Sequence, residues 1–449
     1  MGRFYQPWVG TPLARVGPGG FMGGVSGLDT ALYAAALATL VGVPLYARAV
    51  RGRQYSIFGF VILVISLPGV LVLHGRLVAS FPSFAAAVTL AFLYGMIATG
   101  GHLGGLVRPR LRPTPFRVLV SIPGMAFVAF GALSGVWLLL LWPIRAGLEY
   151  FGATSVASAL EWLDLVPVAI VILSVVTSMR LVDEVVRFSI AEDGPEEFTR
   201  MPVERYRRRT PAPLPERPLR IVQVTDPHLG PWQPVRKLRR SIERLIAMEP
   251  DLVLLTGDFL TMEGMGTPGA LAEALEPLQA LSGRCYAVFG NHDHESPEEV
   301  RDGLEAAGVR LLMDEEAIVE TPVGPAQIVG ADYRRRERRE HLAAVLERYP
   351  RREGHVRLLL LHDPSAFKHV PKGAADLTLS GHTHGGQLGT VSFGFDWTVL
   401  KRTPWPDHGL FGHGANRLYV HRGTGFYGFP LRIGVPGEAS RLEVSLVKG

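Results

Sequence analysis

The hydrophobic positions divide the chain into two parts with different patterns. In the first part, five mostly apolar stretches follow one another, and each approaches the roughly 20 residues that a membrane-spanning helix needs. Glu161 and Asp164 stand near the start of the fifth stretch, which makes it the weakest of the set. The pattern predicts a helical membrane domain with about five transmembrane helices, over residues 28–46, 56–73, 80–100, 118–142 and 156–178.

In the second part, the apolar runs are shorter and alternate with segments of helical spacing. The helical spacing is clear at 235–248 and 269–282. Continuous apolar runs of this length are typical of strands that are covered on both faces. The alternation predicts an α/β domain whose strands lie at 219–226, 251–258, 284–293, 355–363, 375–384, 417–425 and 440–446.

Composition sharpens the boundary between the two parts. From Ala31 to Leu148 the chain has no Asp, Glu or Lys, and its first lysine is Lys237. The stretch 190–219 is polar and rich in proline, as linkers often are. The single cysteine, Cys285, excludes an internal disulfide. We therefore predict a membrane domain at 1–185, a Pro/Arg-rich linker at 186–217 and an α/β domain at 218–449.

The charges of the loops predict the orientation in the membrane. The loops after the first, third and fifth stretches are rich in arginine, and the loops after the second and fourth are poor in it. By the positive-inside rule, arginine-rich loops face the cytoplasm. The chain is therefore predicted to be a multi-pass protein of the inner (cytoplasmic) membrane, with its N-terminus outside and its C-terminal domain in the cytoplasm.

The formal net charge of +5 owes much to arginine clusters, among them 205–209 and 333–340. In one interpretation these clusters are ordinary solvated surface. In the other they contact anionic lipid headgroups or an anionic substrate. Both interpretations stay open at this level, and the lipid bilayer is an expected partner in either case.

The ends of the predicted strands carry side chains that bind metal ions. One aspartate or histidine at a strand end is usually a cap or a turn residue, but five such patches in order predict a metal site at the edge of a sheet. Oxygen and imidazole ligands without thiolate suit Mn, Fe or Zn and leave the choice open. The patches are Asp226 and His228 in TDPH, Asp258 in TGD, Asn291 and His292 in GNHD, His362 in LLHD, and His382 and His384 in GHTHGGQ.

The order D-x-H, G-D, G-N-H-D, H and G-H-x-H resembles the calcineurin-like metallophosphoesterases, over residues 218–447. The GHTHGGQ patch and the ending RGTGFYGFPLRIGVPGE are similar to the bacterial YaeI- and YkuE-type branch. Five spans followed by this domain also resemble the transmembrane proteins with a metallophosphoesterase domain. The resemblance implies a two-sheet β-sandwich flanked by helices, two divalent metal ions and the activity of a metal-dependent phosphoric ester hydrolase.

The resemblance also implies a role for each position of the pattern. A hydroxide that bridges the two metals attacks phosphorus in line, and Asp258 bridges the same two metals. His292 faces the leaving group, and Asp293 orients it. Arg422, in HRGTG, is either a donor to the substrate phosphate or a structural arginine, and both interpretations stay open. The remaining ligands are Asp226, His228 and His384 for one metal, and Asn291, His362 and His382 for the other.

These features leave three functions to compare. The first is a membrane-anchored phosphoesterase that cleaves a phosphomonoester, a phosphodiester or a pyrophosphate, possibly in a lipid-linked substrate such as UDP-diacylglucosamine. The second is a catalytically silent membrane sensor or scaffold on the same fold. The third is a nuclease, which is disfavoured because the sequence has no long basic stripe with interleaved aromatics. No nucleic-acid partner is therefore expected.

Overall fold

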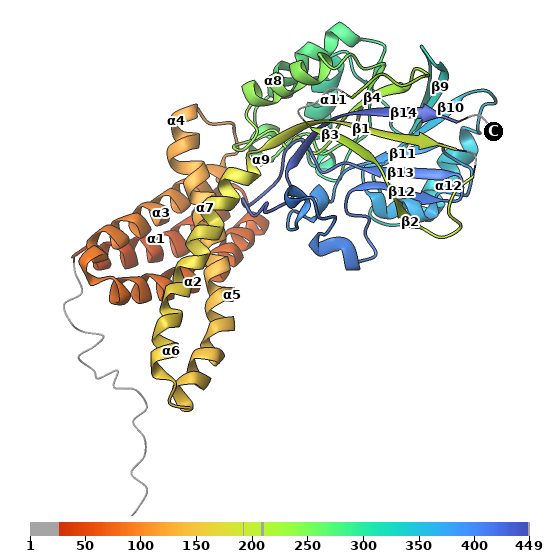
Figure 1. Ribbon diagram of the computed structural model, residues 1–449. Helices are drawn as coiled ribbons and strands as arrows, with labels where there is room; N and C mark the ends of the chain where they lie inside the picture. Colours follow the sequence, from red (N-terminus) through yellow and green to blue (C-terminus); the bar gives the residue numbers. More distant parts are fainter. Residues whose placement is uncertain (1–26, 192, 208–210, 448–449) are drawn as a thin grey trace, which may run out of the picture.

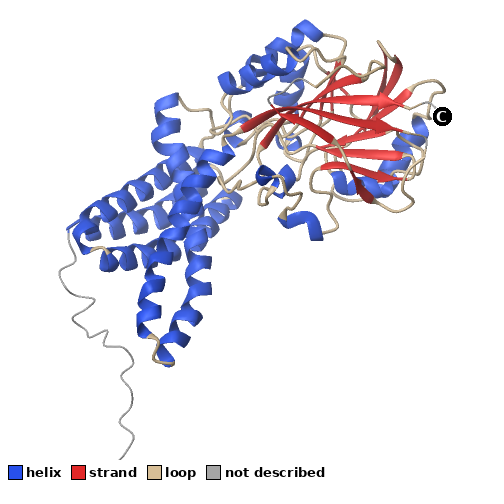
Figure 2. Ribbon diagram, in the orientation of Figure 1, coloured by secondary structure: helices blue, strands red, loops and turns tan. Residues whose placement is uncertain are grey.

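The computed structural model describes residues 27–191, 193–207 and 211–447 (Figure 1). A helical part comes first, and an α/β part with red strands and flanking helices follows it (Figure 2). The N-terminus, which was predicted to lie on the outer side of the membrane, is not among the described residues. Arg208 and Arg209 of the first arginine cluster are not among them either.

Five helical segments of the described chain are long and apolar enough to cross a bilayer, which confirms the predicted number. They are Gly27–Val50, Arg53–Ser80, Pro82–Val107, Thr114–Tyr150 and Thr154–Ser178. The individual helices are α1 (Gly27–Val50), α2 (Arg53–Ser80), α3 (Ala85–Val107), α4 (Thr114–Phe116), α5 (Ile122–Tyr150), α6 (Thr154–Ala159) and α7 (Val166–Ser178), with 3-10 turns at Pro82–Phe84 and Leu160–Leu165 and a π-helical turn at Arg117–Ser121.

Asp164, near the start of the fifth span, is paired with arginines inside the bundle. The Asp164 carboxylate is buried and lies 2.6 Å from the Arg76 Nε and 2.7 Å from the Arg145 Nη2. An ionised group at this depth is tolerated because it is paired. The pairing therefore explains how an aspartate stands in a sequence that otherwise reads as a span.

The α/β part contains two seven-stranded sheets, as the predicted β-sandwich requires. The strand order is β3-β1-β14-β4-β5-β6-β7 in the first sheet and β2-β12-β13-β11-β10-β9-β8 in the second. The strands are β1 (Leu181–Ile190), β2 (Thr199–Met201), β3 (Glu204–Arg207), β4 (Leu219–Val224), β5 (Leu252–Leu255), β6 (Cys285–Ala287), β7 (Arg310–Leu311), β8 (Glu315–Thr321), β9 (Gly324–Gly330), β10 (Val356–Leu360), β11 (Leu377–Ser380), β12 (Gly409–His413), β13 (Asn416–Val420) and β14 (Gly437–Leu446).

Three apolar layers hold the sheets and helices together. Ile221 and Leu254 of the first sheet meet Leu358 and Leu379 of the second in an apolar layer between the sheets. Helices cover the outer face of each sheet, which is why the central strands are apolar on both sides. These helices are α8 (Val235–Ile246), α10 (Ala270–Leu275) and α11 (Pro297–Ala306) on the first sheet and α12 (Arg338–Arg348) on the second; the short α9 (Met262–Met265) lies toward the spans.

The structure differs from the prediction in the segment 186–217, which was expected to be a linker. β1 pairs in parallel with β14, and β2 pairs with β12 of the other sheet, so this segment adds strands to both sheets. No local signal marks β1 and β2, because their partners β14 and β12 lie more than 200 residues away. We propose that the α/β domain begins at Leu181, directly after the last span.

The α/β domain rests on one set of ends of the transmembrane helices. The Leu111 N–H donates to Thr267 Oγ1 over 2.7 Å, and Arg117 Nη1 donates to the Pro231 carbonyl over 3.2 Å. At the end of α7, the Ser178 hydroxyl accepts the Arg432 N–H at 3.1 Å. Figure 1 shows this junction between the helical part and the sheets. The junction therefore joins the ends of the third, fourth and fifth spans to the strand-end loops.

Candidate metal centre

The predicted ligands gather at one edge of the two sheets. β4 and β5 are parallel neighbours in the first sheet, and β10 and β11 are parallel neighbours in the second. Parallel strands present their carboxyl ends at the same edge, where open α/β sheets bind ligands. Asp226, Asp258, His362 and His382 follow the ends of these four strands within three residues. The sheet topology thus brings together residues that lie up to 156 positions apart.

Two groups of three side chains have the geometry of metal sites. In each group the potential ligand atoms lie within 4.8 Å of one another. His362 Nε2 lies 3.1 Å from His382 Nδ1, so both nitrogens can bind one cation at about 2.1 Å. His362 Nδ1 donates to the Thr256 carbonyl, which leaves the lone pair on Nε2. The groups are Asp226, His228 and His384, and Asp258, His362 and His382.

Asp258 and Asn291 complete the arrangement. Asp258 Oδ2 lies 3.3 Å from His362 Nε2 and 3.8 Å from His228 Nε2, so it stands between the two groups. Asn291 Oδ1 is buried and has no hydrogen-bond partner among the described residues. A buried amide oxygen without a partner is costly unless a cation meets it. Both observations fit two adjacent divalent ions.

The electrostatics of the site favour the ligand forms of the imidazoles. Burial lowers the pKa of His228 to about 3 and the pKa of His382 to about 4, so both rings are neutral, as metal ligands must be. Burial alone would lower the pKa of His362, but the Asp258 carboxylate raises it to about 10. The Asp258 carboxylate therefore stabilises a positive charge next to it. That charge is either a protonated His362 ring or a divalent cation.

Five of the candidate ligands have left-handed backbone conformations. Their φ angles lie between 45° and 68°, and they are five of the nine non-glycine residues with positive φ in the described chain. Each such conformation costs about 1–2 kcal/mol for a residue with a side chain. Strain of this kind clusters at functional sites, where the surrounding structure imposes it. The five residues are Asp226, His228, Asp258, His382 and His384.

Two motif glycines make room for the carboxylates. A Cβ atom on Gly290 would lie 2.2 Å from Asp258 Oδ1, and a Cβ atom on Gly381 would lie 2.2 Å from Asp226 Oδ2. Both glycines stand inside the sequence motifs GNHD and GHTHGGQ. The reason for each is a close approach across the sheet edge, which no local pattern reveals.

We expect Gly290→Ala to displace the Asp258 carboxylate and to weaken metal binding by about 10–100-fold, the range seen when the support of a metal ligand is lost. Activity is expected to fall in parallel and to recover partly at high metal concentration. Metal content and turnover of the purified protein check this. Gly75→Ala, where an added Cβ meets nothing within 4 Å, is the control. Unchanged metal content in the Gly290 variant would contradict the placement of Asp258.

His292 lies at the site but belongs to neither group of three. Its ring centroid is 5.7 Å from that of His228, and its backbone N–H donates to Asp258 Oδ1 at 2.9 Å. Its Nδ1 lies 2.8 Å from Glu295 Oε1. Burial alone would lower the pKa of His292, but the hydrogen bond with Glu295 and the nearby carboxylates of Asp258 and Asp293 together raise it. The structure therefore pairs the His292 ring with Glu295.

Asp293 was expected to orient His292, and the structure places its carboxylate elsewhere. It accepts hydrogen bonds from the backbone N–H groups of Asp258, Phe259 and Gly290, at 2.7 to 2.8 Å. Asp293 therefore holds together the loops that follow β5 and β6, and with them the backbone of Asp258. Sequence reasoning missed Glu295 because its distance from His292 depends on a 3-10 turn at Asp293–Glu295.

Arg422 is wholly buried. Its Nη2 donates to Glu184 Oε1 over 2.6 Å, and its Nε lies 3.6 Å from Glu438 Oε2. Of the two interpretations of Arg422, this geometry favours the structural arginine. Glu184 belongs to β1, so the ion pair also ties the first strand after the membrane to the loop that follows β13.

Comparisons with known proteins agree with this geometry. The calcineurin-like phosphoesterase family profile matches residues 219–386. The Escherichia coli phosphodiesterase YaeI is 29% identical over 51% of this chain and 82% of its own length. The Bacillus subtilis metallophosphoesterase YkoQ is 30% identical over 51% of this chain and 82% of its own length. A transmembrane protein with metallophosphoesterase domain from Danio rerio is 32% identical, over 51% of this chain and 52% of its own length.

The chain therefore belongs to the calcineurin-like metallophosphoesterases, a family of metal-dependent phosphoric ester hydrolases. It is a multi-pass membrane member, because five long apolar helices precede the catalytic domain. A solved structure, the NAD nucleotidase of Haemophilus influenzae, overlaps 37% of the chain and 38% of its own at 16% identity with a TM-score of 0.28, which is too low to support an inference.

Proposed function

We propose that this protein hydrolyses a phosphodiester or pyrophosphate of a lipid-linked substrate at the membrane surface. The observation that carries the proposal is the path of the segment from Phe426 to Phe429. Phe426 packs with Met125 of α5 and with Trp232, and Phe429 packs against the same cluster. Between them, the Tyr427 ring lies 4.7 Å from that of His292 and 5.2 Å from that of His228. One short segment thus contacts both the spans and the metal centre.

This path puts the metal centre beside the ends of the spans, where lipid headgroups lie. Trp232, four residues after His228, packs on Met125 and donates to the Gly428 carbonyl over 3.2 Å. A substrate whose acyl chains stay in the bilayer is therefore delivered close to the site, at a high effective concentration. UDP-diacylglucosamine is one concrete substrate of this class.

We assign the ligands as two groups with one shared member. Asp226, His228 and His384 would hold one ion, Asn291, His362 and His382 would hold the other, and Asp258 would be the member that the two groups share. When bound, the two ions supply Lewis acidity for the phosphoryl oxygens and lower the pKa of a bound water. Manganese, iron and zinc all suit these ligands. His292, held by Glu295, faces the leaving group and donates a proton to it.

We further propose that the catalytic domain faces the cytoplasm. The ends of the spans that contact the catalytic domain are the arginine-rich ones, such as Arg51 and Arg117. At the opposite ends, Arg76 and Arg145 pair with Asp164, and the loops there add only the acidic Glu149 and Glu161, so no positive excess remains in them. By the positive-inside rule, the basic ends lie on the cytoplasmic side.

We expect the full-length protein to cleave an acylated nucleotide-linked glycolipid at least about tenfold more efficiently than its deacylated counterpart, because anchoring raises the effective concentration. Both substrates carry the same headgroup, and kcat/KM is measured in the same nanodisc preparation. A soluble aryl phosphodiester serves as the loading control. Equal or higher efficiency with the deacylated compound would contradict a lipid-linked substrate and leave a soluble phosphoester in its place.

A further inference from the structure

A cleft of about 890 Å³ lies at the junction between the spans and the catalytic domain. The membrane side contributes α4 and the turn after it, together with the end of α7, at Met179. The catalytic side contributes the loop from Gly230 to Val235 and one face of α8. Figure 1 shows α4 and α8 standing on the same side of the junction. Because α3 and α7 end here, the cleft lies at the level of the lipid headgroups.

The walls of this junction cleft carry a large excess of positive charge. Six cationic side chains face two carboxylates, Glu263 and Glu273. Burial raises the pKa of Glu263, which weakens its ability to neutralise them. Within the described residues, only Arg244 of the six has a carboxylate within 4 Å, the exposed Asp183. The six cations are Arg112, Arg117, Arg236, Lys237, Arg240 and Arg244.

Backbone carbonyls hold three of these cations in place without neutralising them. Arg112 donates to the Gly105 carbonyl over 2.9 Å, and Arg117 to the Pro231 carbonyl over 3.2 Å. Lys237 donates to the carbonyls of Met179 and Trp232, each over 3.2 Å. Burial, with Arg117 and Arg244 nearby, lowers the pKa of Lys237 to about 8. Partly buried cations that repel one another are stabilised by an anion between them.

The α8 side of the cleft is a continuous cationic stripe. Arg236, Arg240 and Arg244 are spaced by four residues and therefore share one helix face. Leu238 and Ile242 are buried against the first sheet. The side chains of Arg236 and Arg240 are exposed and have no partner among the described residues. Both are available to a ligand in the cleft.

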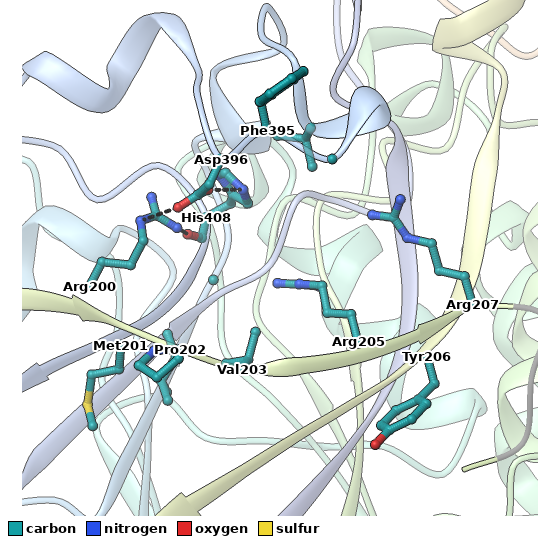
Figure 3. Close-up of a pocket in the computed structure, with 14 residues that line it drawn as sticks. Arg200, Met201, Pro202, Val203, Arg205, Tyr206, Arg207, Phe395, Asp396 and His408 are labelled. Atoms are coloured by element: carbon teal, nitrogen blue, oxygen red, sulfur yellow. Dashed lines mark hydrogen bonds and ion pairs between the residues drawn. The ribbon is translucent and has the colours of Figure 1, made fainter.

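A second large cavity shows what a neutralised arginine cluster looks like. It has a volume of about 800 Å³ and lies among β2, β3 and the loop that precedes β12 (Figure 3). Arg200 contacts Asp396 at 3.1 Å and also pairs with Asp407. Arg205 and Arg207 both pair with Glu184. These arginines stabilise the fold, whereas those of the junction cleft lack such partners.

We propose that the junction cleft binds a phosphate group at the headgroup level, outside the metal centre. Arginine and lysine are the side chains that bind phosphate oxygens, and anionic lipids concentrate at the cytoplasmic surface. A bound lipid phosphate would bridge α4 and α8 and so hold the catalytic domain against the spans. None of the candidate metal ligands lines the cleft, so the proposal does not depend on the identity of the substrate.

The test uses the full-length protein in nanodiscs of phosphatidylcholine with or without phosphatidylglycerol. After detergent extraction, the lipid that stays bound is measured by native mass spectrometry. We expect phosphatidylglycerol to be retained in preference to phosphatidylcholine. In the double variant Arg236→Gln/Arg240→Gln, we expect retention to fall about tenfold or more, since each cation near an anionic surface contributes to binding.

The matched control removes the same charge from another surface. Arg301 on α11 and Arg348 on α12 are exposed and have no partner among the described residues, and neither lines the cleft. The variant Arg301→Gln/Arg348→Gln is expected to retain the lipid. Equal losses in both double variants, or equal retention of the two lipids by the wild type, would overturn the assignment to a lipid phosphate.

Two further arms locate the ligand and its source. Asp258→Asn is expected to retain the lipid fully, and loss in this variant would place the lipid at the metal centre and overturn the proposal. Inorganic phosphate and glycerol phosphate are tested as soluble ligands by thermal shift in the phosphatidylcholine nanodiscs. A shift that the Arg236/Arg240 variant loses, without lipid retention, would support a phosphate site of soluble source. Binding of neither lipid nor soluble phosphate would overturn the site.

Discussion

Asp258→Asn is expected to abolish turnover, with a loss of more than about a thousandfold, and to lower the content of both metal ions. The carboxylate stands between the two groups, 3.3 Å from His362 Nε2 and 3.8 Å from His228 Nε2. Asparagine keeps the size of the side chain but removes the negative charge that two adjacent cations share. Losing several kcal/mol of transition-state stabilisation corresponds to a factor of this size. Metal analysis and turnover of a generic aryl phosphodiester measure both effects.

The control for this change is another aspartate of the same domain. Asp302 on α11 is exposed and has no partner among the described residues, so Asp302→Asn is expected to leave activity and metal content unchanged. Full activity of the Asp258 variant would contradict the bridging role. A wild-type protein that is loaded with each candidate metal and turns over no phosphoester would instead support the silent sensor.

His292→Ala is expected to keep the metal ions. Its turnover is expected to fall about 10²–10⁴-fold, the range that a general acid contributes. The ring stands outside both groups of three, so its removal takes away no ligand. It faces Tyr427 at 4.7 Å between centroids, on the side of the site that adjoins the spans. kcat and metal content are measured on the same preparation, because only their separation identifies the role.

Glu295→Gln distinguishes a positioned His292 from one that merely fills space. The Glu295 carboxylate lies 2.8 Å from His292 Nδ1, so the variant is expected to lose less turnover than His292→Ala and to keep its metal. The double variant is expected to resemble His292→Ala alone, since the two residues act as a unit. Loss of metal in either single variant would contradict the separation between ligand and proton donor.

Local patterns predicted the spans and the candidate ligands, because both depend on local properties of the chain. Apolar length determines whether a helix crosses a bilayer, and each ligand follows a short apolar strand. β1 and β2 escaped prediction because their partners, β14 and β12, lie more than 200 positions away. Arg422 stayed ambiguous for the same reason, since its partner Glu184 lies 238 positions away.

The sequence by itself determined the class of protein: five spans, an α/β domain, and an ordered set of candidate carboxylate, amide and imidazole ligands. Only the tertiary structure decided how these parts meet. It paired His292 with Glu295 and placed the Asp293 carboxylate on three backbone N–H groups. It also brought Tyr427 against His228 and His292, while the adjacent Phe426 packs on the spans. Ligand identity and apolar length are local properties of the chain, whereas the distance between two side chains depends on strand order and domain docking.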